Sequence, residues 1–286
     1  MTSLTIRRTH EAVRDDIADL TTRRPVPGPT LEHLNPFLFL NHHGPQVYPA
    51  NNRGLPFGPH PHRGFETVTF ILEGELAHAD TGGHESIIKA GGIQWMTAGS
   101  GLVHSELSPE AFKQNGGALE ILQLWVNLPA RFKMTAPRYI GLQRDAIPAV
   151  RTADGLGVVN VISGRFGDQA GPVDSLTDVF MSTVALDTGG RVRFENLGGR
   201  VVFLYVVRGS VRVGDTDLHA YQLAEMNEGS GTLELSATDD AVLLFGHADP
   251  IDEPVVAHGP FVMNTADEIH QAIADYRAGK FQVDPS

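Results

Sequence analysis

The chain has 286 residues, enough for one large or two medium domains of about 150 residues and for a full hydrophobic core. Its formal net charge of −12 argues against a nucleic-acid backbone or an anionic membrane as the main partner, since both attract clustered Lys and Arg. Cysteine is absent. Disulfides, thiol nucleophiles and iron–sulfur clusters are therefore excluded, and any metal must take nitrogen and oxygen ligands.

Neither a membrane span nor a secretory signal is visible. The longest purely apolar run, Val201–Val207, is far shorter than the roughly 20 residues of a membrane-spanning helix. The first residues, MTSLTIRRTH, contain no apolar segment of the kind found in signal peptides. We therefore expect a cytoplasmic protein with no membrane partner and no direct nucleic-acid partner.

Short strand-like segments follow one another along the chain. Gly and Pro number 31 and 18 residues, which is high for a helical bundle and natural for strands joined by turns. Gly, Asn, Asp or Pro bound most of these segments, the pattern of an all-β sandwich or barrel. The strands are expected at Thr67–Leu72, Leu119–Val126, Val158–Ile162, Val179–Leu186, Val201–Val207, Thr232–Leu235 and Ala241–Phe245.

The best helical pattern is close to the C-terminus. Thr265 and Glu268 have the spacing of a capping box, and Gly279 is positioned to end a helix. An apolar stripe lies between them, at Ile269, Ile273 and Tyr276. The pattern predicts one short C-terminal helix.

A weak internal repeat relates the two halves of the chain. Residues 73–81 align with residues 208–216, and in both an apolar run leads into a Gly, as at a strand–turn–strand corner. The shared Gly, Asp and Thr are residues that turns favour, so chance convergence of two hairpins stays open. Linker-like residues lie between the halves. We expect domains over residues 1–145 and 146–250, followed by a tail with the helix over residues 251–286.

Residues 54–67, GLPFGPHPHRGFET, are the densest cluster of reactive side chains. His60 and His62 are two residues apart, so on a strand both side chains leave the same face. A second pair with this spacing, His104 and Glu106, follows a Gly-rich turn. On neighbouring antiparallel strands the two pairs would surround one ion and leave positions open for water, substrate or dioxygen. Glu66 shares the face of His62, so spacing alone leaves the choice of carboxylate open, and solvated or core histidines are the alternative.

Four strings of the chain are distinctive: HPHRGFETVT at 60–69, QWMTAGSG at 94–101, QLWVNLP at 123–129 and PVVAHGPFVMNT at 254–265. They resemble the pirin family of the cupin superfamily, and the resemblance covers nearly the whole chain. It implies an all-β fold of two tandem cupin (jelly-roll type) β-barrels, with metal in the N-terminal barrel only.

The resemblance implies that His60, His62, His104 and Glu106 bind one mononuclear divalent metal ion, usually Fe(II), and leaves Glu66 as a barrel residue. It also implies a dioxygenase related to quercetin 2,3-dioxygenase. Such an enzyme opens the ring of an aromatic flavonol with O2 and releases CO, and Glu106 or a bound hydroxide accepts the proton of the substrate hydroxyl. The alternative is a non-enzymatic regulator whose metal or redox state controls binding to a protein partner, either a transcription factor or a metabolic enzyme.

The C-terminal half lacks an equivalent set of ligands. At the repeat offset, Glu195 and Leu197 stand where His60 and His62 stand in the first half. These residues cannot form a two-histidine chelate, so we expect a C-terminal barrel without metal ligands.

Several other residues allow two interpretations. His42 is either a donor near the pocket or part of a surface loop, and Arg63 either orients an anionic substrate or forms a salt bridge at the barrel rim. His78 and His84 flank an expected hairpin tip and should be solvated. Aromatic side chains either line the cavity or belong to the ordinary core, namely Phe57, Phe65 and Trp95.

Overall fold

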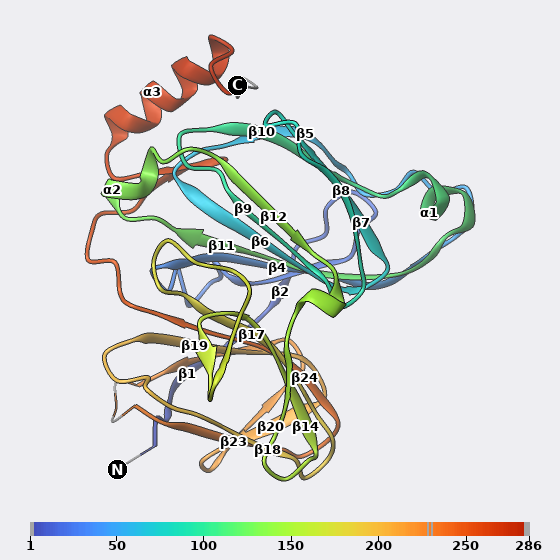
Figure 1. Cartoon of the computed structure of the whole chain (residues 1–286), viewed down its shortest axis with the longest axis vertical. Helices are drawn as coiled ribbons and strands as arrows, with labels where there is room; N and C mark the ends of the chain where they lie inside the picture. The colour runs from blue at the N-terminus through green and yellow to red at the C-terminus, as the bar shows by residue number, and fades with distance from the viewer. Residues whose placement is uncertain (1–2, 228, 230, 283–286) are drawn as a thin grey trace. The chain divides into compact units, whose positions relative to one another are not determined.

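The computed structural model of the chain describes residues 3–227, 229 and 231–282. Strands dominate it, as predicted, and they form two β-barrels (Figure 1). The chain divides into two compact units. We call them the N-terminal barrel (residues 14–24, 37–145 and from 251 onward) and the C-terminal barrel (residues up to 13, 25–36 and 146–250).

This division differs from the expected linear one at both ends of the chain. Strand β1 (Ile6–Glu11) pairs antiparallel with β22 (Gln222–Met226), so the first residues belong to the C-terminal barrel. The tail from residue 251 belongs to the N-terminal barrel, where Figure 1 shows helix α3 (Ala266–Arg277) beside β5 and β10. Pairing between strands more than 200 residues apart is set by the tertiary fold and leaves no local trace in the sequence.

Two sheets build the N-terminal barrel, in the orders β12-β9-β6-β11-β4-β3-β2 and β5-β10-β7-β8. The strands are β2 (Val13–Arg14), β3 (Thr22–Val26), β4 (Phe37–Tyr48), β5 (Phe57–His62), β6 (Phe65–Glu73), β7 (Glu75–Asp80), β8 (Glu85–Lys89), β9 (Ile93–Thr97), β10 (Leu102–Leu107), β11 (Gly117–Asn127) and β12 (Arg138–Leu142). The remaining elements of this unit are α1 (Glu110–Asn115), α2 (Ala130–Lys133), the 3-10 turn Arg144–Ala146 at its boundary, β25 (Val256–His258) and β26 (Phe261–Met263).

The C-terminal barrel has the corresponding sheets β1-β22-β19-β24-β17-β14-β13 and β18-β23-β20-β21, and a small hairpin of β15 and β16. Its strands are β13 (Ala149–Arg151), β14 (Gly157–Ser163), β15 (Arg165–Phe166), β16 (Gln169–Ala170), β17 (Phe180–Leu186), β18 (Arg191–Phe194), β19 (Val201–Arg208), β20 (Ser210–Val213), β21 (Thr216–His219), β23 (Leu233–Ala237) and β24 (Ala241–Ala248), with β1 and β22 as given above.

The predicted repeat corresponds to the same corner in both barrels. Gly74 joins β6 to β7, and Gly209 joins β19 to β20. Both glycines have a positive φ, +83° and +74°, which residues with a side chain rarely adopt. The repeat therefore marks a shared strand–Gly–strand turn.

The C-terminal helix forms as predicted, with one difference on its buried face. Thr265 is the N-cap of α3 and makes a complete capping box with Glu268, and Gly279 follows the helix with a φ of +73°. Tyr276, expected on the apolar stripe, is 40% exposed, whereas Asp275 is buried. The burial of an acid is explained by its ion pair with Arg63.

The interiors of the two barrels differ in polarity. The C-terminal barrel encloses one large cluster of Val, Leu and Phe side chains. The N-terminal barrel has a smaller apolar cluster, which includes Ile71 and Leu119, and it also buries the polar side chains of Thr69, His104 and Glu106. Buried polar groups are costly unless they have partners or ligands, so this difference points to the N-terminal barrel as the site of function.

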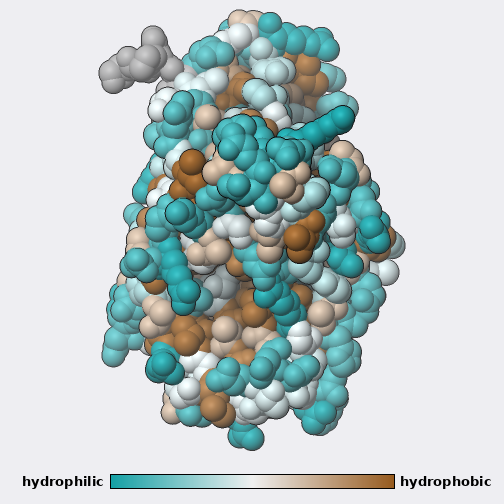
Figure 2. Space-filling view, turned by 90° about the vertical axis from the view of Figure 1, so that its right-hand side faces the viewer, coloured by the Kyte–Doolittle hydropathy of each residue, from teal (hydrophilic) through white to brown (hydrophobic). Residues whose placement is uncertain are grey.

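Hydrophilic residues cover most of the face seen in Figure 2, and apolar residues gather in its lower part. Within the described part of the chain, no helix combines the length and the apolar character needed to cross a bilayer.

Candidate metal centre

Three of the predicted ligands come together in the N-terminal barrel. Strands β5 and β10 are antiparallel neighbours, and their register places His60 opposite His104 and His62 opposite Leu102. One nitrogen from each of His60, His62 and His104 lies within 4.8 Å of the others. The ring centroids are 4.4 to 5.0 Å apart.

The state of these histidines fits a divalent metal ion. Both ring nitrogens of His104 are buried and have no hydrogen-bond partner. Burial lowers the pKa of His62 to about 3, with a smaller contribution from His60, and burial also lowers the pKa of His104 well below its usual range. His60 Nδ1 lies 2.8 Å from Gly58 O and His62 Nδ1 lies 3.4 Å from Pro260 O, so Nε2 of each ring is left for an ion. Neutral imidazoles oriented through their second nitrogen are the usual metal ligands.

Glu106 lies beside this cluster but is not part of it. It is two residues beyond His104 on the same buried face of β10. Its Oε1 accepts a hydrogen bond from Thr69 Oγ1 at 2.8 Å, and its Oε2 accepts one from Gln123 Nε2 at 2.5 Å. Both contacts hold the carboxylate in one orientation within the barrel.

Glu66 has different surroundings. It lies three residues before Thr69 on β6, so the two side chains leave opposite faces of that strand. Its Oε1 accepts a hydrogen bond from Thr97 Oγ1 at 2.6 Å, and burial raises its pKa. Thr69, which donates to Glu106, therefore lies on the opposite face of β6 from Glu66.

Aromatic side chains flank the histidines. The ring of His62 lies 5.0 Å from Phe65 and 5.4 Å from Trp125, and Trp125 stacks on Phe39 with centroids 4.6 Å apart. Trp125 Nε1 is buried without a hydrogen-bond partner. A flat ligand would find ring surfaces and an unused donor here. Of the other expected wall residues, Phe57 contacts His43, and Trp95 is a buried core residue.

His78 was expected to be solvated, and that expectation is wrong. His78 is only 3% exposed, and the register of β7 with β10 places it opposite Glu106. His78 Nε2 lies 2.9 Å from Asp80 Oδ2, and its ring stacks on Tyr139 with centroids 4.0 Å apart. The alternation of Leu76, His78 and Asp80 along one strand is the signal that could have placed it inward. The His84 side chain is 48% exposed.

His42 is also buried, which excludes the surface-loop interpretation. Its side chain has no exposed area, and its Nε2 lies 2.8 Å from Glu120 Oε1. The neighbouring His43 is buried as well, and its Nδ1 lies 2.9 Å from Thr22 Oγ1.

Arg63, which follows His62, forms the salt bridge that was one of its two interpretations. Its Nη1 donates to Asp275 Oδ2 at 2.8 Å, and its Nε donates to Ser100 O at 2.7 Å. The guanidinium also lies 4.6 Å from the centroid of the Phe281 ring. This contact joins the strand of the histidines to α3 and the residues that follow it.

Gly64 and Lys133 extend this attachment. Gly64 has a φ of +89°, and a Cβ at this position would lie 2.0 Å from Val262 O, so the close approach of the C-terminal segment requires glycine. Lys133 Nζ is buried and donates to Gly64 O, Asn127 Oδ1 and Val262 O at 2.8 to 3.0 Å. Gly64 and Lys133 therefore hold the C-terminal segment at Val262 against the residues that follow His62.

The C-terminal barrel offers different groups. Leu197 is a buried core residue, and His247 Nδ1 accepts a hydrogen bond from Arg200 Nε at 2.6 Å. Burial lowers the pKa of His247 to about 3, with a smaller effect of Arg200. Across the described ranges, the only group of three or more potential metal-ligating side chains is His60, His62 and His104.

Comparisons with known proteins agree with this architecture. The pirin family model matches residues 19–126, and that of the pirin C-terminal cupin domain matches residues 181–282. A pirin-like protein of Caulobacter vibrioides is 42% identical over 269 residues, 93% of this chain and 94% of that one. A Pseudomonas aeruginosa protein with the provisional name quercetin 2,3-dioxygenase is 41% identical over 250 residues, 87% of each chain. The crystal structure of a quercetin 2,3-dioxygenase from Acinetobacter baumannii is 32% identical, with a TM-score of 0.90 over 98% of this chain and 99% of that one. The chain, with its two cupin domains, is therefore a member of the pirin family.

Proposed function

We propose that the chain is a mononuclear metal dioxygenase that opens the ring of a flavonol such as quercetin with O2 and releases CO. The observation that carries this proposal is the convergence of three buried histidines, of which His104 has no partner for either nitrogen. The relatives named quercetin 2,3-dioxygenase support the substrate class.

In this proposal His60, His62, His104 and Glu106 hold one divalent ion, Fe(II). Once bound, such an ion supplies Lewis acidity toward a substrate hydroxyl and redox chemistry toward dioxygen. The choice of Glu106 over Glu66 is supported by its position on the strand of His104 and by its contact with Thr69 on the interior face of β6.

Glu106 is also the proposed proton acceptor for the substrate hydroxyl. Thr69 and Gln123 each donate to one of its oxygens, and each carboxylate oxygen can accept a second hydrogen bond. Phe65 and Trp125 would lie against the planar rings of the substrate, and Trp125 Nε1 is a donor available to a substrate oxygen. These residues orient the substrate and exclude water from it.

The test is the aerobic loss of quercetin absorbance with metal-loaded protein, together with detection of CO. Removal of a general base costs about 10²- to 10⁴-fold in rate, so Glu106→Gln should lose at least about 100-fold. Glu110→Gln, which changes an exposed glutamate on α1, should match the unmodified protein. Metal content is measured in each sample, because Glu106 has two proposed roles.

The dioxygenase proposal would be ruled out if the metal-loaded parent protein consumed quercetin no faster than the Glu106→Gln variant. The metal- or redox-dependent regulator would then be the remaining prediction for the same site.

A further inference from the structure

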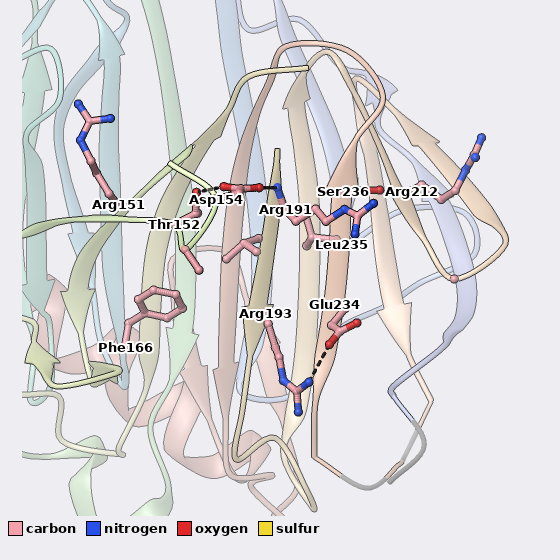
Figure 3. Close-up of a pocket in the computed structure, with 13 residues that line it drawn as sticks. Arg151, Thr152, Asp154, Phe166, Arg191, Arg193, Arg212, Glu234, Leu235 and Ser236 are labelled. Carbon is pink, nitrogen blue, oxygen red and sulfur yellow. Dashed lines mark hydrogen bonds and ion pairs between the residues drawn. The ribbon is translucent and has the colours of Figure 1, made fainter. Parts of the chain in front are cut away.

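The C-terminal barrel carries a pocket of about 750 Å³, within the roughly 300–1,000 Å³ typical of small-molecule sites. Figure 3 shows it over the sheet that contains β18 and β23, next to the loop of Thr152 and Asp154 and the ring of Phe166. Alternation along β18 buries Val192 and Phe194 and turns the two arginines of that strand outward. The pocket therefore lies on the outer face of the sheet.

The charge of the pocket is opposite to that of the chain. Four arginines and two acids line it, in a protein whose formal net charge is −12. The arginines are Arg151, Arg191, Arg193 and Arg212, and the acids are Asp154 and Glu234. A local excess of positive charge on an acidic protein indicates an anionic ligand.

Most of these charged groups already have partners. Arg193 forms ion pairs with Glu195 and Glu234, and Arg212 forms one with Asp217. Asp154 accepts hydrogen bonds from Thr152 Oγ1 at 2.6 Å and from two backbone N–H groups, those of Leu156 and Arg191. Figure 3 shows the Arg151 side chain directed away from the centre of the pocket.

Two of the arginines, Arg151 and Arg191, have no such partner in the described part of the chain, and of these Arg191 lies beside Ser236. Among the described residues, none forms a hydrogen bond or ion pair with the Arg191 guanidinium or with the Ser236 hydroxyl. The register of β18 with β23 places Arg191 opposite Ser236, and Arg212 flanks Ser236 from the other side. Figure 3 shows the end of the Arg191 side chain next to Ser236. A guanidinium fork beside a hydroxyl matches the geometry of a carboxylate.

An apolar side chain lies beside these polar groups. Phe166 is a partly buried residue of the lining and packs against Phe194 with ring centroids 5.4 Å apart, whereas the side chains of Val192 and Leu235 are buried in the barrel core. The carboxylates of Asp154 and Glu234 disfavour a ligand with several negative charges. We propose that this pocket binds a small aromatic monocarboxylate, whose carboxylate lies on Arg191 and Ser236 and whose ring lies near Phe166.

The test is calorimetric titration of the full-length, metal-loaded protein with 2-naphthoate, its neutral amide and inorganic phosphate. The unmodified protein should bind one equivalent of 2-naphthoate. Arg191→Gln should weaken the affinity for 2-naphthoate at least tenfold, and Ser236→Ala should weaken it about threefold. Arg277→Gln removes an exposed arginine on α3, in the other unit, and should leave the affinity unchanged. The amide should bind at least tenfold more weakly than the acid.

Both substitutions change side chains without described partners, so each variant should unfold at the temperature of the parent protein. The proposal is overturned if 2-naphthoate does not bind, or if both variants bind it as tightly as the parent, since any bound naphthoate would then lie elsewhere, including at the metal centre. Phosphate bound as tightly as 2-naphthoate would overturn the assignment to an aromatic carboxylate.

Discussion

Arg63 Nη1 lies 2.8 Å from Asp275 Oδ2, and this ion pair fastens the C-terminal helix to the residue that follows His62. Both side chains are largely buried, with 5% and 12% of their area exposed. Gln271 and Lys280 also donate to Asp275 Oδ1, so both carboxylate oxygens have partners. Asp275 therefore supplies the polar part of the attachment of α3, beside the apolar packing of Ile269 and Ala272.

Asp275→Asn should lower the free energy of unfolding by about 3 kcal/mol, because it leaves the Arg63 charge buried without its counter-ion. Urea denaturation measures this change. Asp252→Asn, at an exposed position of the same C-terminal segment, should change stability by less than about 0.5 kcal/mol. Equal stability of the two variants would show that the ion pair does not hold the helix.

The same carboxylate should make stability depend on pH. Arg63, followed by Lys280, holds the pKa of Asp275 well below its usual range. Below about pH 4 the unfolded chain takes up a proton that the folded protein resists, so the stabilisation is present above that pH and is lost as the pH falls further. Urea midpoints of the parent protein and Asp275→Asn should therefore converge below about pH 4. A difference that stays constant from neutral to acidic pH would contradict this.

Lys133→Met should also destabilise the N-terminal barrel. The substitution keeps a long side chain but removes the donor shared by Gly64 O, Asn127 Oδ1 and Val262 O. An unsatisfied buried acceptor costs about 1–3 kcal/mol, so we expect a loss of at least about 3 kcal/mol in thermal or urea unfolding. Lys113→Met, on the partly exposed surface of α1, is the matched control. Equal unfolding of the two variants would contradict the structural role of Lys133.

The three histidines and the all-β fold were predictable because their signals are local. The spacing of His60 and His62 alone places them on one face of a strand. Gly64 shortly after them adopts the positive φ that the close approach of Val262 requires. The alternation of Leu76, His78 and Asp80 could have placed His78 inward, but its position opposite Glu106 depends on the register of β7 with β10, which the sequence does not state. The placement of β1 was missed for the same reason, since its partner is β22.

The pocket on the C-terminal barrel shows the same limit. Arg191, Ser236 and Arg212 come from three strands, and only the strand order β18-β23-β20 places them side by side. No spacing pattern connects them along the chain. The pocket of the C-terminal barrel could therefore not be predicted from the sequence.

The central claim is that three histidines of the N-terminal barrel bind one metal ion, and elemental analysis of protein purified without a histidine tag tests it most directly. We predict close to one equivalent of metal per chain in the parent protein and in His270→Ala, which alters an exposed histidine on α3, and almost none in His104→Ala. A parent protein without metal after incubation with Fe(II) and removal of excess ion, or a His104→Ala variant that retains a full equivalent, would contradict the claim.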